Sequence, residues 1–425
     1  HRYTQTPPAP AAPTMAFTKL AAAAVAALAV AASSVSTASA MSMGNYIGYL
    51  SGHQMVPPVN AAGTGTVKAS YNADTKMLAV SFHFRGLAMG VKELGLYAAW
   101  AGRNGEEQFP LASVTKFGHG HTDGMGHTTV MLSDRQAELL MAREFYMMVG
   151  KELRGQLVPS VKGAKTLSAS LSSAFTNPPT MSTAFGGVIV ELMPTGAMIV
   201  TGSWQGLSSP LALNLANGNH FHIGLTGTNG ERIFVLQPTL SDNNTTAFYT
   251  ADKNTYTPTA EFLDMMKARG VYMDVHSELL PTGELRGQVL SAASSSAYTT
   301  LLSPASVNPP AEGSDATGGL SVEYFFPSTI AVTGSFSMLS SPVAVDLAMG
   351  THLHVGPADG AGPRIQELVA TKSDDNMMGD FMLDDNVFII NSTNQKNLLS
   401  QLVYCDIHTA MFRAGELRGQ LASIV

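Results

Sequence analysis

Six of the twelve histidines form two matched sets of three, and their type and spacing could bind a metal ion. The first set is His220, His222 and His276; the second, 132 residues further along the chain, is His352, His354 and His408. Alternate side chains of a β-strand share a face, so the two rings of each H-x-H pair project from Cα atoms about 6.5–7 Å apart. Such a pair can hold copper or zinc when a third histidine arrives from an adjacent strand.

An acidic residue precedes the third histidine of each set by two positions. These residues, Asp274 and Asp406, share a strand face with that histidine and could orient one of the rings. Alternatively, the histidines, acids and arginines of a half-buried face could satisfy one another as a hydrogen-bonded structural network. The residue types leave both interpretations open.

A third group of histidines, His119, His121 and His127, lies in the glycine-rich stretch GHGHTDGMGH. Flexible histidine-rich loops can bind copper or zinc weakly. A solvated loop without a defined ligand geometry is the alternative. The chain contains no nucleophile-elbow, phosphate-loop or zinc-protease motif, so no catalytic residue is assigned.

One hexapeptide occurs three times, as KELRGQ at 151–156 and as GELRGQ at 283–288 and 415–420. The constant period of 132 residues predicts tandem domains. Alternation places the leucine of the motif on one strand face and its acid and arginine on the other. The motif is therefore interpreted as a structural closing strand, with the pairs Glu152 and Arg154, Glu284 and Arg286, and Glu416 and Arg418.

The repeats divide the chain into residues 1–40, 41–160, 161–292 and 293–425. In the second unit, alternating runs predict several strands, including one at Leu211–Ala216. The segment TPTAEFLDMMKARG predicts a helix capped by Thr257 and ended by Gly270, and short helices are predicted at the same place in the other units. The expected fold is all-β, with immunoglobulin-like antiparallel sandwiches and one short helix per domain.

The first unit is expected to lack the histidine set. Alignment of RNGEEQF (103–109) with TNGERIF (228–234) puts Gly95 and Tyr97 at the positions of His220 and His222. No histidine lies near the first ELRGQ motif. This first domain is therefore interpreted as degenerate.

The N-terminal region predicts export. After Met15, which is the expected start, Lys19 precedes the apolar run Leu20–Ala32, and Ala38–Ala40 forms a small-residue cleavage site. We therefore expect a secreted protein, in the periplasm or cell wall if the source is bacterial. Without residues 1–40 the chain has 22 basic and 31 acidic residues and no basic stripe, which argues against a nucleic-acid partner. The C-terminal residues do not form an apolar tail of the kind that would predict a membrane anchor.

The chain has a single cysteine, Cys405, so no disulfide can form within it and each domain must be held by its own core. Glycosylation sequons stand at Asn243, Asn244 and Asn391. They would be used only in a eukaryotic secretory route.

Five stretches, which represent three motifs, resemble the CHRD domain, the module named after chordin. They are the opening LSGHQMVPPVNAAGTGTV, the segments HFHIGLTGTNGERIFVL and THLHVGPADGAGPRI, and the closing YMDVHSELLPTGELRGQV and YCDIHTAMFRAGELRGQL. The resemblance implies extracytoplasmic immunoglobulin-like sandwiches in three tandem copies. It also implies a faint likeness to copper–zinc superoxide dismutase at the two H-x-H strands.

We therefore expect a secreted binding or structural protein without catalysis, used in adhesion or in matrix or cell-wall association. Its expected ligand is an extracellular protein or glycan. The alternative is a metal-binding protein or copper-dependent oxidoreductase that uses the two histidine sets with copper or zinc.

Overall fold

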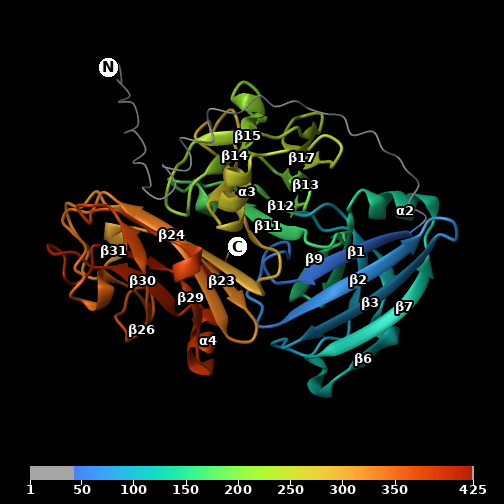
Figure 1. Ribbon diagram of the computed structural model, residues 1–425, viewed down its shortest axis with the longest axis horizontal. Coiled ribbons are helices and arrows are strands. Elements are labelled where there is room, and N and C mark those ends of the chain that lie inside the picture. The colour runs from blue at the N-terminus through green and yellow to red at the C-terminus, as the bar shows by residue number, and fades with distance from the viewer. Residues whose placement is uncertain (1–42, 424–425) are drawn as a thin grey trace.

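The computed structural model describes residues 43–423, which form three β-rich domains in chain order (Figure 1). The predicted export signal at Leu20–Ala32 and Ala38–Ala40 lies outside the described residues. Each domain has two antiparallel layers, and the all-β sandwich prediction is confirmed. Within the described range, no helix has the length and apolarity of a membrane span.

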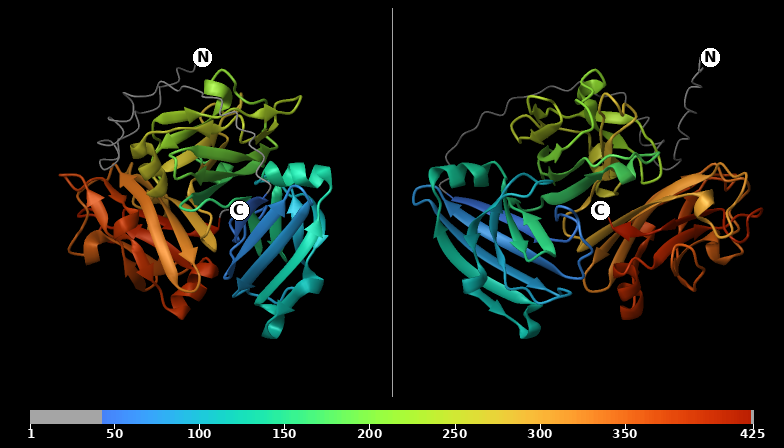
Figure 2. Two further views of the ribbon diagram at one scale, coloured as in Figure 1. Left: turned by 45° about the vertical axis from the view of Figure 1, so that its right-hand side comes forward. Right: turned by 180° about the vertical axis from the view of Figure 1, so that it is seen from behind.

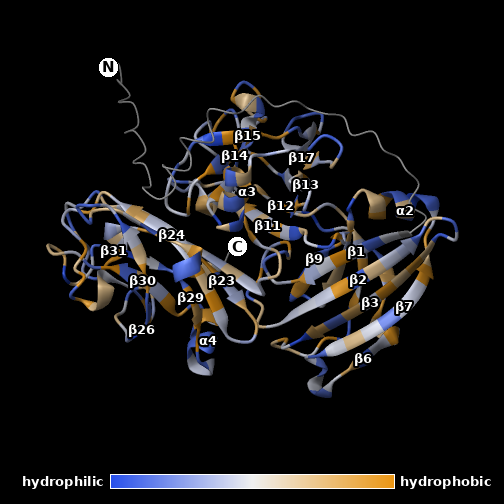
Figure 3. Ribbon diagram, in the orientation of Figure 1, coloured by the Kyte–Doolittle hydropathy of each residue, from blue (hydrophilic) through white to orange (hydrophobic). Residues whose placement is uncertain are grey.

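The first domain packs a six-stranded sheet against a four-stranded sheet. The larger sheet contains β10 (Val158–Pro159), β1 (Met43–Leu50), β2 (Thr64–Asn72), β3 (Met77–Arg85), β7 (Gly124–Met131) and β6 (Thr115–Phe117), in that order. The smaller one contains β5 (Glu106–Pro110), β4 (Leu94–Ala98), β8 (Phe145–Val149) and β9 (Leu153–Gln156). Buried and exposed residues alternate strictly along β3, which puts one face on the core and the other in solvent (Figure 3).

The second domain repeats this plan, but its layers join into one eleven-stranded sheet because β20 pairs with β11. One layer contains β11 (Lys165–Ser172), β12 (Phe185–Leu192), β13 (Met198–Gln205), β16 (Thr239–Leu240), β17 (Thr246–Tyr249), β18 (Thr255–Tyr256) and β21 (Leu290–Ser291). The other contains β14 (Asn219–Ile223), β15 (Arg232–Val235), β19 (Val271–Val275) and β20 (Leu285–Gln288).

The third domain has a seven-stranded and a four-stranded sheet. The first contains β22 (Ser296–Leu302), β23 (Thr317–Phe325), β24 (Thr329–Ser337), β27 (Ala370–Lys372), β28 (Gly379–Phe381), β29 (Val387–Ile389) and β32 (Ala422–Ser423). The second contains β25 (Thr351–Val355), β26 (Arg364–Glu367), β30 (Val403–Ile407) and β31 (Leu417–Gln420).

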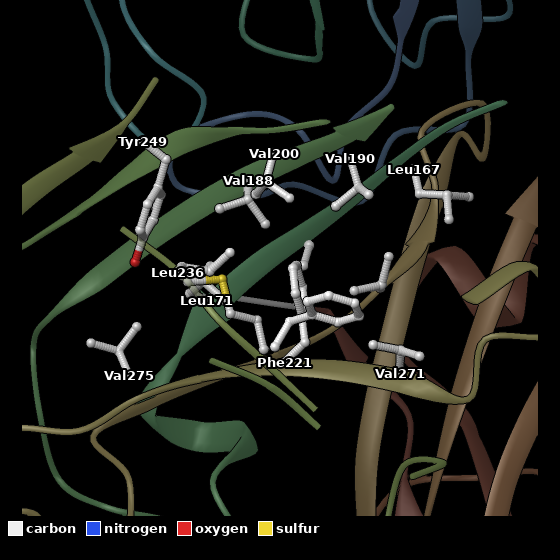
Figure 4. Packing of buried hydrophobic residues seen from close by; sticks show 14 of the residues in the cluster. Leu167, Leu171, Val188, Val190, Val200, Phe221, Leu236, Tyr249, Val271 and Val275 are labelled. Carbon is white, nitrogen blue, oxygen red and sulfur yellow. The ribbon is translucent and has the colours of Figure 1, made fainter. Parts of the chain in front are cut away.

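Each domain has a separate apolar core between its layers. In the second domain, Val188 and Val200 face Phe221 and Val271 across the gap, and all four are almost fully buried (Figure 4). Burial of such a side chain contributes about 1.5–3 kcal/mol. These cores hold the strands that carry the histidines in a fixed register without any disulfide.

One short helix per domain is present, as the sequence predicts: α2 (Asp134–Met141), α3 (Ala260–Lys267) and α4 (Ser392–Leu399). The predicted cap of α3 is wrong by two residues. The cap is Thr259, whose hydroxyl accepts a hydrogen bond from the backbone N–H of Phe262, so Thr257 lies outside the helix.

Consecutive domains dock through the same ion pair twice. Arg143 Nε lies 2.5 Å from Glu191 Oε1 between domains one and two. Arg269 Nε lies 2.6 Å from Glu323 Oε2 between domains two and three. Both carboxylates are almost completely buried. The three domains therefore follow one head-to-tail docking mode, and Figure 2 shows them packed together from two further sides.

His53 is a buried contact of the first domain with the second. Its Nε2 lies 2.8 Å from the Ser168 hydroxyl, its carbonyl accepts a hydrogen bond from the Ser170 hydroxyl, and its side chain is 2 % exposed. Burial lowers the pKa of His53 to about 4. The His53 ring is therefore neutral in the folded protein at neutral pH.

We expect acidification to weaken this contact. Because the folded pKa is depressed below the unfolded value, the stabilisation is complete above pH 6.5 and is lost as pH falls from 6.5 to 4, by up to about 3 kcal/mol. Urea unfolding at pH 7 and pH 4.5 measures it. The site histidines titrate in the same direction, so the informative quantity is the difference between the wild type and His53→Gln. Equal pH dependence in both proteins would contradict the prediction.

Candidate metal centres

The second domain brings its three predicted histidines together beside one sheet face. Alternation along β14 puts Phe221 into the core and His220 and His222 on the opposite face. His276 directly follows β19, the strand paired with β14. One ring nitrogen from each of the three lies within 4.8 Å of the others. Strand pairing thus supplies the third ring that the sequence pattern required.

The other nitrogen of each ring is held by a main-chain carbonyl. His222 Nδ1 lies 2.9 Å from the carbonyl oxygen of Gly230, and His276 Nδ1 lies 2.9 Å from that of Pro281. His220 uses Nε2 for the same purpose, 3.2 Å from the carbonyl oxygen of Leu215. A carbonyl oxygen only accepts, so these nitrogens carry the hydrogen of each neutral ring.

The remaining nitrogens therefore offer lone pairs to one another. His220 Nδ1 lies 2.8 Å from His222 Nε2, although neither atom has a hydrogen to donate in these tautomers. His276 Nε2 is buried and has no hydrogen-bond partner among the described residues. Two facing lone pairs and a buried orphan acceptor are costly unless a cation lies between them.

Burial argues against a proton as that cation at neutral pH. Desolvation, followed by the neighbouring His222 and His276, lowers the pKa of His220 to about 3. Desolvation also lowers the pKa of His222 to about 4 and lowers that of His276. The rings are thus neutral donors of the kind that bind transition metals. The arrangement fits copper or zinc, with main-chain carbonyls fixing each ring.

The third domain repeats the arrangement on β25 and just after β30. His352 Nδ1 lies 3.2 Å from His354 Nε2, and His408 Nε2 is again a buried atom without a partner. The outer nitrogens of these rings lie 2.8–2.9 Å from the carbonyl oxygens of Leu347, Gly362 and Arg413. Desolvation lowers the pKa of His352 to about 4 and lowers the pKa of both His354 and His408.

The loop before each H-x-H strand differs from the sequence prediction. Leu211–Ala216 is not a strand: after an isolated bridge at Leu211 the chain turns into a short 3-10 segment, Ala216–Gly218. Ala216 and Asn217 take left-handed backbone angles, with φ of 48° and 58°. This turn points the Leu215 carbonyl at His220. The Asn-Gly pair at 217–218 is the sequence signal that could have predicted this turn.

The two acids are not the ring partners proposed from the sequence. Asp274 lies opposite His220 in the strand pair, but carbonyls take the outer nitrogens of all three rings. Its Oδ1 is buried without a partner. Burial raises the pKa of Asp274 to about 7 against the lowering effect of Arg286, and raises that of its counterpart Asp406 to about 6.

The first domain cannot form the same centre. Gly95 and Tyr97 occupy the register positions of His220 and His222, because Tyr97 pairs with Tyr146 as His222 pairs with Tyr272. The hairpin that carries His276 in the second domain is shorter here and turns at Gly150. A Cβ on Gly150 would lie only 2.7 Å from Val91 Cγ1.

The histidines of the glycine-rich stretch are separated by the fold. His119 and His121 lie in a short 3-10 turn, where His121 stacks on Phe117. His127 lies on β7, opposite Ser81. Within residues 43–423, no third group of three histidine, cysteine or acidic ligands comes together.

The ELRGQ motif binds main-chain and side-chain groups of neighbouring loops. Glu284 accepts hydrogen bonds from the N–H of Ser208 and the hydroxyl of Ser182. Arg286 donates to the carbonyl of Thr228, 2.7 Å away, and lies over the Tyr272 ring. The motif's acid and arginine thus hold different loops instead of pairing with each other.

The other two copies of the motif make matching contacts. Glu152 accepts from Ala88 and Met89, and Glu416 accepts from Ser340. Arg154 and Arg418 donate to main-chain carbonyls and lie over Tyr146 and Tyr404, respectively.

The sequons lie at exposed or half-buried loop positions. Asn243 accepts hydrogen bonds from the Ser241 hydroxyl and the N–H of Thr245, and Asn244 has a left-handed φ of 55°. Asn391 caps α4 through the N–H of Asn394.

The three sandwiches and their closing strands correspond to a known domain. The family model of the CHRD domain matches residues 48–157, 167–289 and 298–421. The chain belongs to the CHRD-domain family. No curated protein sequence matches it. The second and third CHRD domains carry the histidine centres, whereas the first retains the closing strand without them.

Proposed function

We propose that this protein is a metal-binding modular protein in which the second and third CHRD domains each hold one copper or zinc ion. The observation that carries the proposal is the convergence of one ring nitrogen from each of three histidines to within 4.8 Å of one another, repeated in two domains. The rings of His220, His222 and His276 would hold the first ion. His352, His354 and His408 would hold the second.

The proposed role of each ion is structural. The carbonyls behind the rings belong to three separate loops, at Leu215, Gly230 and Pro281. An ion held by the rings would therefore fasten these loops around one point, and its binding free energy would add to the folding free energy of the domain.

We further propose that these stiffened domains act outside the cytoplasm, in adhesion or in matrix or cell-wall association. Support comes from the export-type segment at Leu20–Ala32. Three linked modules would raise avidity for a repetitive extracellular surface.

Ion counting tests the metal proposal. The chain from Met41 to Val425 is loaded with zinc or copper and dialysed, and the bound metal is measured. We expect about two ions for the wild type, about one for His276→Ala or His408→Ala, and none for the double variant. Each variant should also lose its share of the metal-induced rise in Tm.

The matched control removes exposed histidines. His83→Ala combined with His127→Ala lies in the first domain and should leave the count at two. No tightly held ion in the wild type, or an unchanged count in the double site variant, would contradict the proposal.

A further inference from the structure

In the part of the chain that the structure describes, only the first domain has a docking face that no preceding domain covers, and at one end of this face Arg85 on β3 lies over the ring of Phe326 from the third domain. In the second and third domains the outer face of β12–β13 or β23–β24 is covered by the preceding domain, which contributes the partner of Glu191 or Glu323. The hydroxyl of Ser203 on this face donates to the carbonyl of Ala101, 2.7 Å away. The matching hydroxyl of Ser335 donates to the carbonyl of Thr226, 2.9 Å away.

Strand register identifies the corresponding positions on β2 and β3 of the first domain. The motif arginine bridges Ser51 in the first domain and pairs with Ser172 in the second, which aligns the two sheets. The positions of Gly187, Ile189, Glu191, Thr201 and Ser203 are then occupied by Thr66, Lys68, Ser70, Ser81 and His83. The acid of the docking face has become a serine, and a lysine and a histidine have been added.

These substitutions exclude a further copy of the chain in the same mode. The docking glycines touch backbone to backbone: a Cβ on Gly102 would lie 2.2 Å from the nitrogen of Gly187. Thr66 adds a side chain at this point. The ion pair is lost on both sides, since Ser70 replaces the acid and Gln401 stands in the third domain where the second has Arg269.

The strands of this face carry positive charge and no negative charge; the carboxylate of Asp123 lies at one end, where it accepts a hydrogen bond from the N–H of Gly86. Strands β1, β2, β3, β6 and β7 contain no aspartate or glutamate. Lys68, His83 and His127 are exposed on these strands. Lys116 on β6 is close to His83 on β3, because both residues pair with Met125 of the strand between them, β7. This contrasts with a chain whose net charge is −7. An anionic partner would be attracted to this face and repelled by much of the remaining surface.

Hydroxyl groups lie among these charges. Ser81 is paired with Lys68 on one side and His127 on the other, and Thr66 lies 3.2 Å from the His83 ring. Serine and threonine hydroxyls donate and accept hydrogen bonds, as sugar hydroxyls do. Single cations separated by hydroxyls match a chain of hydroxylated sugars that carries charges at intervals.

We propose that the outer face of β2, β3, β7 and β6 binds an acidic polysaccharide. Lys68 and Lys116 pair with its carboxylate or sulfate groups, and Ser81 and Thr66 with its hydroxyls. This gives the proposed extracellular binding role a ligand class and a location. It does not depend on the metal centres, so the two proposals fail separately.

The test measures binding of the chain from Met41 to Val425 to polygalacturonate, dextran sulfate and uncharged dextran. We expect binding to a polyanion and none to dextran. Lys68→Glu combined with Lys116→Glu should weaken binding about tenfold or more and reduce its salt dependence. The control, Lys162→Glu with Lys165→Glu, makes the same change in net charge at exposed positions elsewhere and should bind as the wild type does.

Three outcomes would overturn the proposal. They are equal weakening by both lysine pairs, equally tight binding of single-stranded DNA or anionic phospholipid vesicles, and a concentration-dependent dimer broken by Lys68→Glu. The His276→Ala, His408→Ala double variant should retain polysaccharide binding, which separates this result from a failure of the metal proposal.

Discussion

Replacing Arg269 by Met should lower the free energy of unfolding by about 3–5 kcal/mol, the cost of leaving one member of a buried ion pair without its partner. The side chain of Glu323 is 2 % exposed, and its other oxygen already accepts a hydrogen bond from the N–H of Ser291. Removal of the guanidinium leaves this carboxylate buried between two domains. Denaturant unfolding measures the loss.

A double-mutant cycle separates the ion pair from simple loss of packing. Arg269→Met with Glu323→Met should recover much of the stability lost by Arg269→Met, because no charge then remains buried. Arg135→Met is the matched control, since its pair with Glu138 is exposed and should contribute less than about 1 kcal/mol. An Arg269→Met protein as stable as Arg135→Met would contradict the docking role.

Replacing Arg286 by Met should destabilise the second domain by about 2–4 kcal/mol. The guanidinium lies 3.4 Å from the Tyr272 ring centroid and donates to Thr228 and Asn229. Methionine keeps part of the packing but leaves the buried carbonyl of Thr228 without its donor. Thermal unfolding measures the loss in the apo protein.

Arg286→Lys provides the sharper comparison. Lysine keeps the charge but lacks the planar fork and the broad contact with the tyrosine ring, so it should recover less than half of the loss. Arg232→Met is the exposed control on the neighbouring β15 and should change stability little. Full recovery by lysine would show that charge alone matters at this position.

Much of the fold was predictable because its signals are local. The 132-residue period identified the units, alternation identified most strands, and the periodic segment before Gly270 identified the helix. The errors occurred where local patterns are ambiguous. Leu211–Ala216 alternates like a strand. It forms only an isolated bridge at Leu211, and residues with left-handed backbone angles then turn the chain.

The sequence predicted which histidines form the candidate centres, but not which nitrogen of each ring faces inward. The H-x-H spacing identified both pairs, and the repeat pointed to His276 and His408. The structure adds which nitrogen of each ring faces inward, because that depends on carbonyls supplied by loops at 215, 230 and 281. Asp274 was proposed as a ring partner since it shares a strand face, yet a carbonyl on a turn is better placed.

The sequence by itself determined the repeated sandwich, the CHRD family and the ligand types available to each domain, since strand periodicity and motif spacing are encoded within a few residues. Only the tertiary structure decided the ring tautomers, the head-to-tail docking and the face of the first domain that stays free. These features arise between residues tens of positions apart, such as Arg269 and Glu323. Their contact depends on how whole sheets pack and not on the pattern within any one strand.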